Sequence, residues 1–210
     1  EYLYTLYYYD QAANLVKTIP PQGVQLIKNT DTLSLIDNYR RNNFDQKILP
    51  SHNMITNYVY NSLNQLSRQS SPDGGTSYFW YDEVGRLLTS QNGKQKEVNA
   101  YSYSNYDNLS RIIESGEITN IFNLDTMVSF TTFSDYENWL LTTGALKTQI
   151  TKIYYDSKEI ILNDFSQENL RNRIASITYD EIGDGFYDFA SHFSYDEHGN
   201  VKSLLQENKY

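Results

Sequence analysis

The chain has 210 residues, a formal net charge of −9 at pH 7 and a pI of about 4.8. This acidity argues against nucleic acid as a partner, since the densest basic spots, Arg40-Arg41 and 171–173, are too short to neutralise phosphates. The absence of cysteine excludes disulfides, cysteine nucleophiles and thiolate metal sites. No apolar run is long enough to cross a bilayer as a helix, so we expect no transmembrane segment.

Tyrosine is the most unusual feature of the composition, with 20 residues against 9 Phe and 2 Trp. Its ring packs on a sheet while its hydroxyl reaches water or a polar neighbour. Together with a hydrophobic content of 39%, this favours an open, two-faced β-sheet over a compact enzyme. We expect one continuous repeat array over 1–210 rather than two domains.

The chain opens on an alternating, strand-like pattern that leads into Tyr9-Asp10, a loose first copy of a recurring turn. The stretch 29–50 then interrupts the regular spacing of the repeats and is interpreted as an insertion. The next copy, at 58–66, has Asn61 in place of aspartate and Asn64 in place of glycine. Asparagine is the best substitute for glycine where φ is positive.

The clearest copy, at 78–88, reads aromatic-x-Tyr-Asp-x-x-Gly-Arg-Leu. Asp82 and Gly85 occupy positions that a type I turn prefers, and the aspartate carboxylate can accept hydrogen bonds from backbone N–H groups. Gly85 with positive φ would close the hairpin with a bulge, and Arg86 begins the outgoing strand. The pattern predicts a β-hairpin, and a looser copy follows at 106–112.

The stretch 119–150 is the second interruption of the array. Ser134 and Glu137 match a capping box, and Gly144 is a plausible helix stop. We predict a short helix over about 135–143, the only helix that we expect in the chain. The alternative is a strand–loop segment.

The acidic segment 180–188 is the best candidate metal site, because its oxygen ligands suit Ca²⁺. Its spacing fails the EF-hand pattern, and we favour a structural interpretation in which Asp180 is a turn aspartate of the repeat. We therefore predict neither a metal nor a cofactor. The last copy, at 193–204, has the complete turn of Asp196, Gly199 and Asn200.

Catalytic patterns are weak throughout the sequence. The three histidines are His52, His192 and His198, and no His-Glu-x-x-His, P-loop or Gly-x-Ser-x-Gly motif occurs. A Ser–His–Asp set can be assembled on paper from any chain this rich in serine and aspartate, so it has no weight without geometry. We assign no catalytic residue and expect no enzyme activity.

The copies at 58–66, 78–88 and 193–204 resemble the YD-repeat family, also called the rearrangement-hot-spot repeat family. That family includes large bacterial secreted and cell-surface proteins, components of insecticidal toxin complexes and the animal teneurins. The resemblance implies a strip of β-hairpins that spirals into a hollow shell, which in toxin members encloses an effector. The Asp-Pro signature of the self-cleaving members is absent here.

The resemblance therefore implies a non-catalytic structural segment of a large exported protein, secreted or at the bacterial cell surface. The implied partners are other repeats or domains of the parent chain, a protein at the exposed sheet edges, or an enclosed effector. Neither end of the sequence reads as a cap, so we interpret the chain as a piece of a longer polypeptide.

Two other hypotheses compete with the structural one. A row of Tyr58, Tyr60, Tyr78 and Tyr81 could form an aromatic platform for carbohydrate on an adhesive surface. The same rings could instead form cross-strand ladders between neighbouring hairpins, which we favour. A hydrolase within 119–150 is the third hypothesis, and it would need a pocket that holds histidine and carboxylates.

Overall fold

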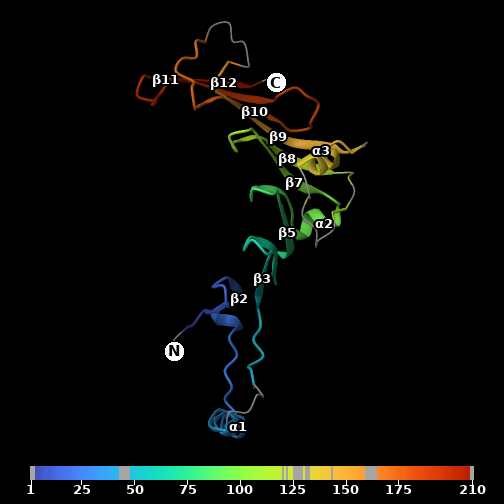
Figure 1. Cartoon of the computed structure of the whole chain (residues 1–210), viewed down its shortest axis with the longest axis vertical. Helices are drawn as coiled ribbons and strands as arrows, with labels where there is room; N and C mark the ends of the chain where they lie inside the picture. The colour runs from blue at the N-terminus through green and yellow to red at the C-terminus, as the bar shows by residue number, and fades with distance from the viewer. Residues whose placement is uncertain are drawn as a thin grey trace. The chain divides into compact units, whose positions relative to one another are not determined.

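The computed structural model describes residues 3–42, 48–119, 121, 123–124, 130, 133–142, 144–158 and 165–208. Over these residues 12 strands follow one another in chain order as an antiparallel sheet, which confirms the predicted all-β class of tandem hairpins (Figure 1). The strands are β1 (Leu6–Tyr9), β2 (Leu15–Ile19), β3 (Thr56–Tyr60), β4 (Leu66–Ser71), β5 (Gly75–Tyr81), β6 (Leu87–Gln91), β7 (Tyr101–Tyr106), β8 (Ile112–Thr119), β9 (Leu146–Tyr155), β10 (Ile174–Asp180), β11 (Phe189–Tyr195) and β12 (Val201–Asn208). The chain divides into two compact units, Glu1–Ser77 and Tyr78–Tyr210.

The described chain contains more helix than the sequence led us to expect. The predicted helix near 135–143 exists as α3 (Phe133–Leu140), but α1 (Thr30–Arg41), α2 (Gly93–Glu97) and a 3₁₀ turn at Pro21–Gly23 were not predicted. The expectation of a single helix was therefore wrong. No helix among the described residues has the length and apolar character that a membrane crossing requires.

The two unexpected helices begin at asparagine caps. The side chain of Asn29 accepts hydrogen bonds from the backbone N–H groups of Asp31 and Thr32 at the start of α1. At α2, Asn92 and Gln95 form a reciprocal capping box. The proposed Ser134–Glu137 capping box is wrong, because α3 begins at Phe133 and Ser134 already lies inside the helix.

Each of the six hairpins carries the same β-bulge. In the first, Tyr9 pairs with Leu15 and Tyr8 with Lys17, so that Val16 has no partner on the facing strand. The residues skipped in this way are Val16, Ser67, Leu88, Ile113, Ala175 and Lys202. The predicted bulge is confirmed, and it recurs at the same place in all six hairpins of the described chain.

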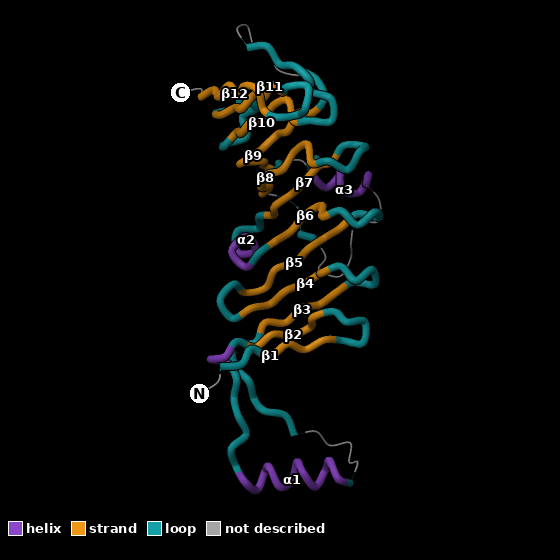
Figure 2. Tube along the Cα trace, turned by 90° about the vertical axis from the view of Figure 1, so that its left-hand side faces the viewer, coloured by secondary structure: helices purple, strands orange, loops and turns teal. Residues whose placement is uncertain are grey.

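Two sets of residues flank every bulge. The junction tyrosines directly precede the turns: Tyr9, Tyr60, Tyr81, Tyr106, Tyr155 and Tyr195. The closing residues directly follow the turns: Asn14, Gln65, Arg86, Arg111, Arg173 and Asn200. In the first unit, the short turns of hairpins β1–β2 and β3–β4 lie along one edge of the sheet (Figure 2). In the second unit, the short turns of hairpins β5–β6 and β7–β8 also lie along one edge.

Neighbouring hairpins pair in a constant register. The third residue after a closing residue lies opposite the third residue before the next junction tyrosine. These pairs are Lys17–Asn57, Thr89–Tyr103, Glu114–Lys152 and Ser176–His192. One rule thus describes four hairpin-to-hairpin junctions whose connecting loops differ in length and sequence.

In the second unit, the aromatic core combines residues of α3 with residues of strands β5 and β7. The ring of Tyr101 lies 5.9 Å from that of Trp80 and 5.3 Å from that of Trp139, both in edge-on geometry. Tyr136 is fully buried, and its hydroxyl lies 3.1 Å from the Leu88 carbonyl oxygen and 2.8 Å from that of Ser104. The stretch 119–150, expected as an insertion, thus contributes part of the core.

A further interruption lies within the fifth hairpin, between Asp156 and Arg173, and the sequence analysis did not find it. The Asp156 N–H still donates to the Arg173 carbonyl, so the turn closes across a long loop. Leu170 from that loop packs with Ala175 and Tyr195 in a second, smaller core. The loop therefore covers part of the last hairpins.

Gly85 is a turn position at which backbone conformation is demanding. Its φ is 91°, in the region that β-branched residues avoid. We predict that Gly85→Val lowers the free energy of unfolding by about 1–3 kcal/mol, measured by urea denaturation. Ser110→Gly is the matched control, because Ser110 holds the same turn position at a φ of 63° and glycine relieves its strain. A valine variant as stable as the parent would contradict this turn geometry.

Candidate functional site: the aspartate turns and hairpin junctions

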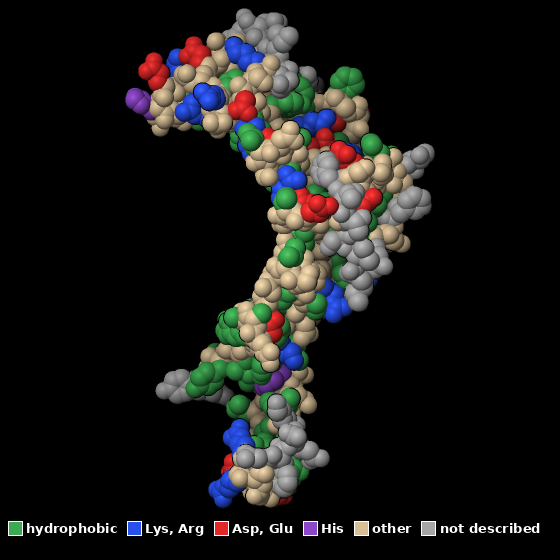
Figure 3. Space-filling model, in the orientation of Figure 1, with side chains coloured by type: hydrophobic (Ala, Val, Ile, Leu, Met, Phe, Trp, Pro, Cys, Tyr) green, Lys and Arg blue, Asp and Glu red, His purple; other side chains and the backbone are tan. Residues whose placement is uncertain are grey.

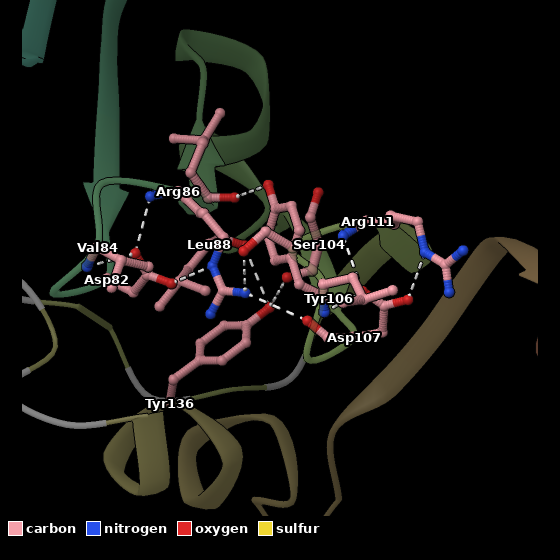
Figure 4. A network of polar contacts seen from close by, with 12 residues as sticks. Asp82, Val84, Arg86, Leu88, Ser104, Tyr106, Asp107, Arg111 and Tyr136 are labelled. Carbon is pink, nitrogen blue, oxygen red and sulfur yellow. Dashed lines mark hydrogen bonds and ion pairs between the residues drawn. The ribbon is translucent and has the colours of Figure 1, made fainter. Parts of the chain in front are cut away.

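The Asp82 turn shows the complete hydrogen-bond pattern of the repeat (Figure 4). The Asp82 N–H donates to the Arg86 carbonyl at 3.0 Å, and the Gly85 N–H donates to the Asp82 carbonyl at 3.1 Å. Asp82 Oδ1 accepts from the N–H groups of Val84 and Arg86 at 3.1 and 2.8 Å. Its Oδ2 accepts from Arg86 Nε at 2.6 Å. Both carboxylate oxygens are thus used within the turn.

Four other turns reproduce this pattern around Asp10, Asn61, Asp107 and Asp196. The residue at the glycine position has positive φ in each: 63° at Ala13, 58° at Asn64, 63° at Ser110 and 92° at Gly199. The loosest copies in the sequence therefore fold like the clearest. The side-chain oxygen of the turn residue holds the backbone even where glycine is missing.

Hydrogen bonds lower the pKa of several turn aspartates. The Asn200 side chain, and then its backbone N–H, hold the pKa of Asp196 below its ordinary value. For Asp10 the backbone N–H of Asn14 is the main cause of the lowered pKa, followed by the Asn14 side chain. In both turns the donors favour the ionised carboxylate, so proton uptake weakens the turn.

Four of the junction tyrosines connect a hairpin to the one before it. The Tyr106 hydroxyl donates to the carbonyl of Leu87, directly after the closing residue Arg86, at 2.8 Å. Equivalent bonds run from Tyr60 to Leu15, from Tyr155 to Ile112 and from Tyr195 to Ile174. The same atom pair is therefore used at each of these junctions.

The closing arginines add a second contact across the junction. The guanidinium of Arg86 lies 4.8 Å from the ring centroid of Tyr106, and that of Arg111 lies 4.2 Å from the ring of Tyr155. Arg173 stands over Tyr195 at 5.5 Å. Each such arginine stacks on the next junction tyrosine, an arrangement worth about 0.5–1 kcal/mol at an exposed site.

The charged side chains of the turns thus serve local structure. Arg111 bonds Asp107 in its own turn and Asp156 in the next, at 2.7 Å in both cases. Lys202 pairs with Glu168 at 2.8 Å. Figure 3 shows acidic and basic side chains intermixed over the face that it draws, which suits cross-strand pairing.

The four tyrosines of the suggested carbohydrate platform are all half-buried. Tyr60 donates to the Leu15 carbonyl, and the Tyr58 hydroxyl lies 3.4 Å from Thr18 Oγ1. Tyr78 packs against the core beside Trp80, while Tyr81 is a half-buried junction tyrosine. Carbohydrate binding stays a prediction that no contact in the structure tests.

The interpretation of Asp180 as a repeat-turn aspartate was wrong. It ends β10, in the connection to the next hairpin, and the turn residue of its own hairpin is Asp156. Its carboxylate oxygens accept from Gly183 N–H at 2.7 Å and Gly185 N–H at 3.0 Å, which orders the loop. Among the described residues, no group of three or more His, Asp and Glu side chains is placed to hold a metal ion.

One serine–histidine–carboxylate chain occurs on the last three strands, and sequence reasoning missed it. Ser176 Oγ lies 2.8 Å from His192 Nδ1, and His192 Nε2 lies 3.2 Å from Glu207 Oε2. Ser176 and His192 are 1% and 0% exposed, so a substrate has no access to the hydroxyl. The nitrogens are also reversed relative to a catalytic triad, in which Nε2 contacts serine. We interpret this hydrogen-bonded row of three side chains as polar packing across the strands.

No family model and no curated protein matches this chain.

Solved structures that resemble it include a crystal structure of TcdB2-TccC3-TEV, with 15% identity over 97% of this chain and 10% of that chain, at a TM-score of 0.34. A crystal structure of TcdB2-TccC3-Cdc42 matches with 14% identity over 98% of this chain and 14% of that one, at a TM-score of 0.31. A Photorhabdus luminescens Tc holotoxin pore matches with 13% identity over 98% and 14%, at a TM-score of 0.29. The chain spans a small part of these proteins, and matches this distant carry no argument about function.

The junction hydrogen bond can be tested at Tyr106. Tyr106→Phe keeps the ring and removes the donor to Leu87, so we predict a loss of about 0.5–1.5 kcal/mol in unfolding free energy. Tyr7→Phe is the control, because that side chain is 58% exposed and its hydroxyl has no partner among the described residues. Equal losses of unfolding free energy for the two substitutions would contradict the view that the Tyr106 hydroxyl holds its hairpin to the preceding one.

The lowered pKa of Asp196 predicts a pH dependence. A depressed carboxyl pKa stabilises the fold above the unfolded-state value of about 3.8, and this contribution disappears as pH falls through the folded pKa. Asp196→Asn should therefore lower the melting temperature at neutral pH. The difference in melting temperature between variant and parent should shrink below about pH 4. Melting temperatures across this range provide the measurement. Glu197→Gln, the same change at an exposed neighbour outside the turn bonds, should show no such convergence.

Proposed function

We propose that this chain is a non-catalytic structural segment of a large exported protein of the YD-repeat type. Its tandem hairpins form part of a wall, in a shell or scaffold that encloses or presents a cargo. The observation that carries the proposal is the constant junction: one register, one bulge and one tyrosine–carbonyl bond recur from hairpin to hairpin.

A constant junction makes an extensible wall. At four junctions a hairpin offers the carbonyl after its closing residue to the tyrosine hydroxyl of the next, so hairpins can follow one another through the same contact. Stability in such arrays is approximately a sum of unit and nearest-neighbour terms. Large surfaces can therefore be built from one short motif, as a shell or scaffold requires.

The use of the polar side chains supports a structural rather than a chemical role. Both carboxylate oxygens of Asp82 accept hydrogen bonds from turn donors or from Arg86. The histidine that contacts a serine and a carboxylate, His192, is completely buried. A catalytic or sugar-binding surface instead needs polar groups that are accessible to the ligand.

A repeat duplication tests the proposal. In a variant that contains residues 61–81 twice in succession, the second copy starts directly after Tyr81, so every turn, bulge and junction tyrosine keeps its position in the repeat. We predict a cooperatively folded β protein with a melting temperature no lower than that of the parent, measured by circular dichroism.

The matched control carries the same duplication with one residue removed from the inserted incoming strand. A one-residue slip moves every following side chain of that strand to the other face of the sheet. This control should therefore unfold at lower temperature or aggregate. An in-phase duplication that fails to fold, or folds no better than the control, would contradict an extensible wall.

A further inference from the structure

The connection between the third and fourth hairpins contains the one asparagine–glycine pair of the sequence, Asn92-Gly93. In such a pair the backbone nitrogen of glycine attacks the preceding side-chain amide more readily than in other pairs, because glycine has no Cβ to obstruct the approach. Asn92 is exposed to solvent, so water reaches the site. The pair therefore has the covalent chemistry of a modification site that needs no ligand and no enzyme.

The capping box of α2 holds this asparagine away from the attacking nitrogen. Asn92 Oδ1 accepts from the Gln95 N–H at 2.9 Å, and the Asn92 N–H donates to Gln95 Oε1 at 3.0 Å. The side chain is thus directed along α2, whereas ring closure needs its Cγ to fold back onto Gly93 N. Because α2 has only 5 residues, it has little stability of its own and opens locally.

We propose that Asn92 is a site of spontaneous deamidation, and that opening of the α2 cap controls the rate. In the open form the Gly93 nitrogen gives its proton to solvent and bonds to Asn92 Cγ. The Cγ–Nδ2 bond breaks, and Nδ2 leaves as ammonia. Water then adds to either carbonyl carbon of the cyclic imide and breaks its bond to the ring nitrogen, which yields aspartate or isoaspartate. This inference goes beyond the proposed function and does not depend on it.

The two products differ in their effect on the sheet, because Gln95 connects the cap to two strands. Gln95 Nε2 donates to Ser102 Oγ of β7 at 2.9 Å and to Glu117 Oε2 of β8 at 3.0 Å. Aspartate keeps the backbone unchanged and is as good an N-cap as asparagine. Isoaspartate instead carries the backbone through its side-chain carbons, which shifts α2 against the strands and breaks the cap. The isoaspartate form therefore loosens the connection between β6 and β7.

Peptide mapping by mass spectrometry tests the site. The folded protein is incubated at mildly alkaline pH in water enriched in heavy oxygen. We expect a product at Asn92 that has lost the amide nitrogen and gained one solvent oxygen, as both aspartate and isoaspartate. Gly93→Ala should slow its formation by on the order of tenfold, because the added methyl group obstructs the attack.

The role of the cap is tested by a matched pair of variants in α2. Gln95→Ala removes the acceptor of the Asn92 N–H and should raise the rate of deamidation several-fold. Lys94→Ala changes a neighbouring side chain outside the capping box and should leave the rate unchanged. A synthetic peptide of residues 90–96, which has no cap, should convert faster than the folded protein.

A second measurement does not depend on the folding of the Gln95→Ala protein. The isoaspartate form, separated from the parent by its added negative charge, should melt at a lower temperature than an Asn92→Asp variant. Equal melting temperatures for these two proteins would overturn the structural effect. The absence of product at Asn92 over a time in which the peptide converts completely, or equal rates in the peptide and the folded protein, would overturn the proposal of a site controlled by its cap.

Discussion

The hydrogen bond from a junction tyrosine to the preceding hairpin is the interaction on which the rest of the sheet depends. Its length stays between 2.8 and 3.1 Å in four hairpins of the described chain. A tyrosine side chain has a fixed reach, so this bond forms only in one register of the two hairpins. Because a slip of one residue inverts every side chain of a strand, fixing the register also fixes which residues form the core.

The rest of the repeat motif supports that bond. The side-chain oxygen of the turn residue and the residue of positive φ close each of these turns, and the carbonyl that accepts the tyrosine hydroxyl lies directly after the closing residue. The closing arginine contacts both the aspartate of its own turn and the tyrosine of the next hairpin, as Arg86 does with Asp82 and Tyr106. The closing arginine is therefore used twice, within a hairpin and between hairpins. This double use explains why the motif is longer than a turn alone requires.

The sequence predicted the hairpins because turn chemistry is local: Asp82, Gly85 and their counterparts act within five residues of one another. It did not reveal what the tyrosine and arginine do across the junction, since those contacts join residues far apart in the chain. The helix caps at Asn29 and Asn92 are local signals that the sequence does contain, because asparagine is a preferred N-cap residue. Asp180 was misassigned because Tyr179-Asp180 copies the motif without a turn, whereas the true turn at Asp156 is split by an insertion.

The register of the junctions is the central claim, and cross-strand nuclear Overhauser effects between backbone protons measure it most directly. The account predicts contacts that join Thr89 with Tyr103, Glu114 with Lys152 and Ser176 with His192 in the same protein. Contacts displaced by one or two residues at any of these junctions would contradict a single rule for the array.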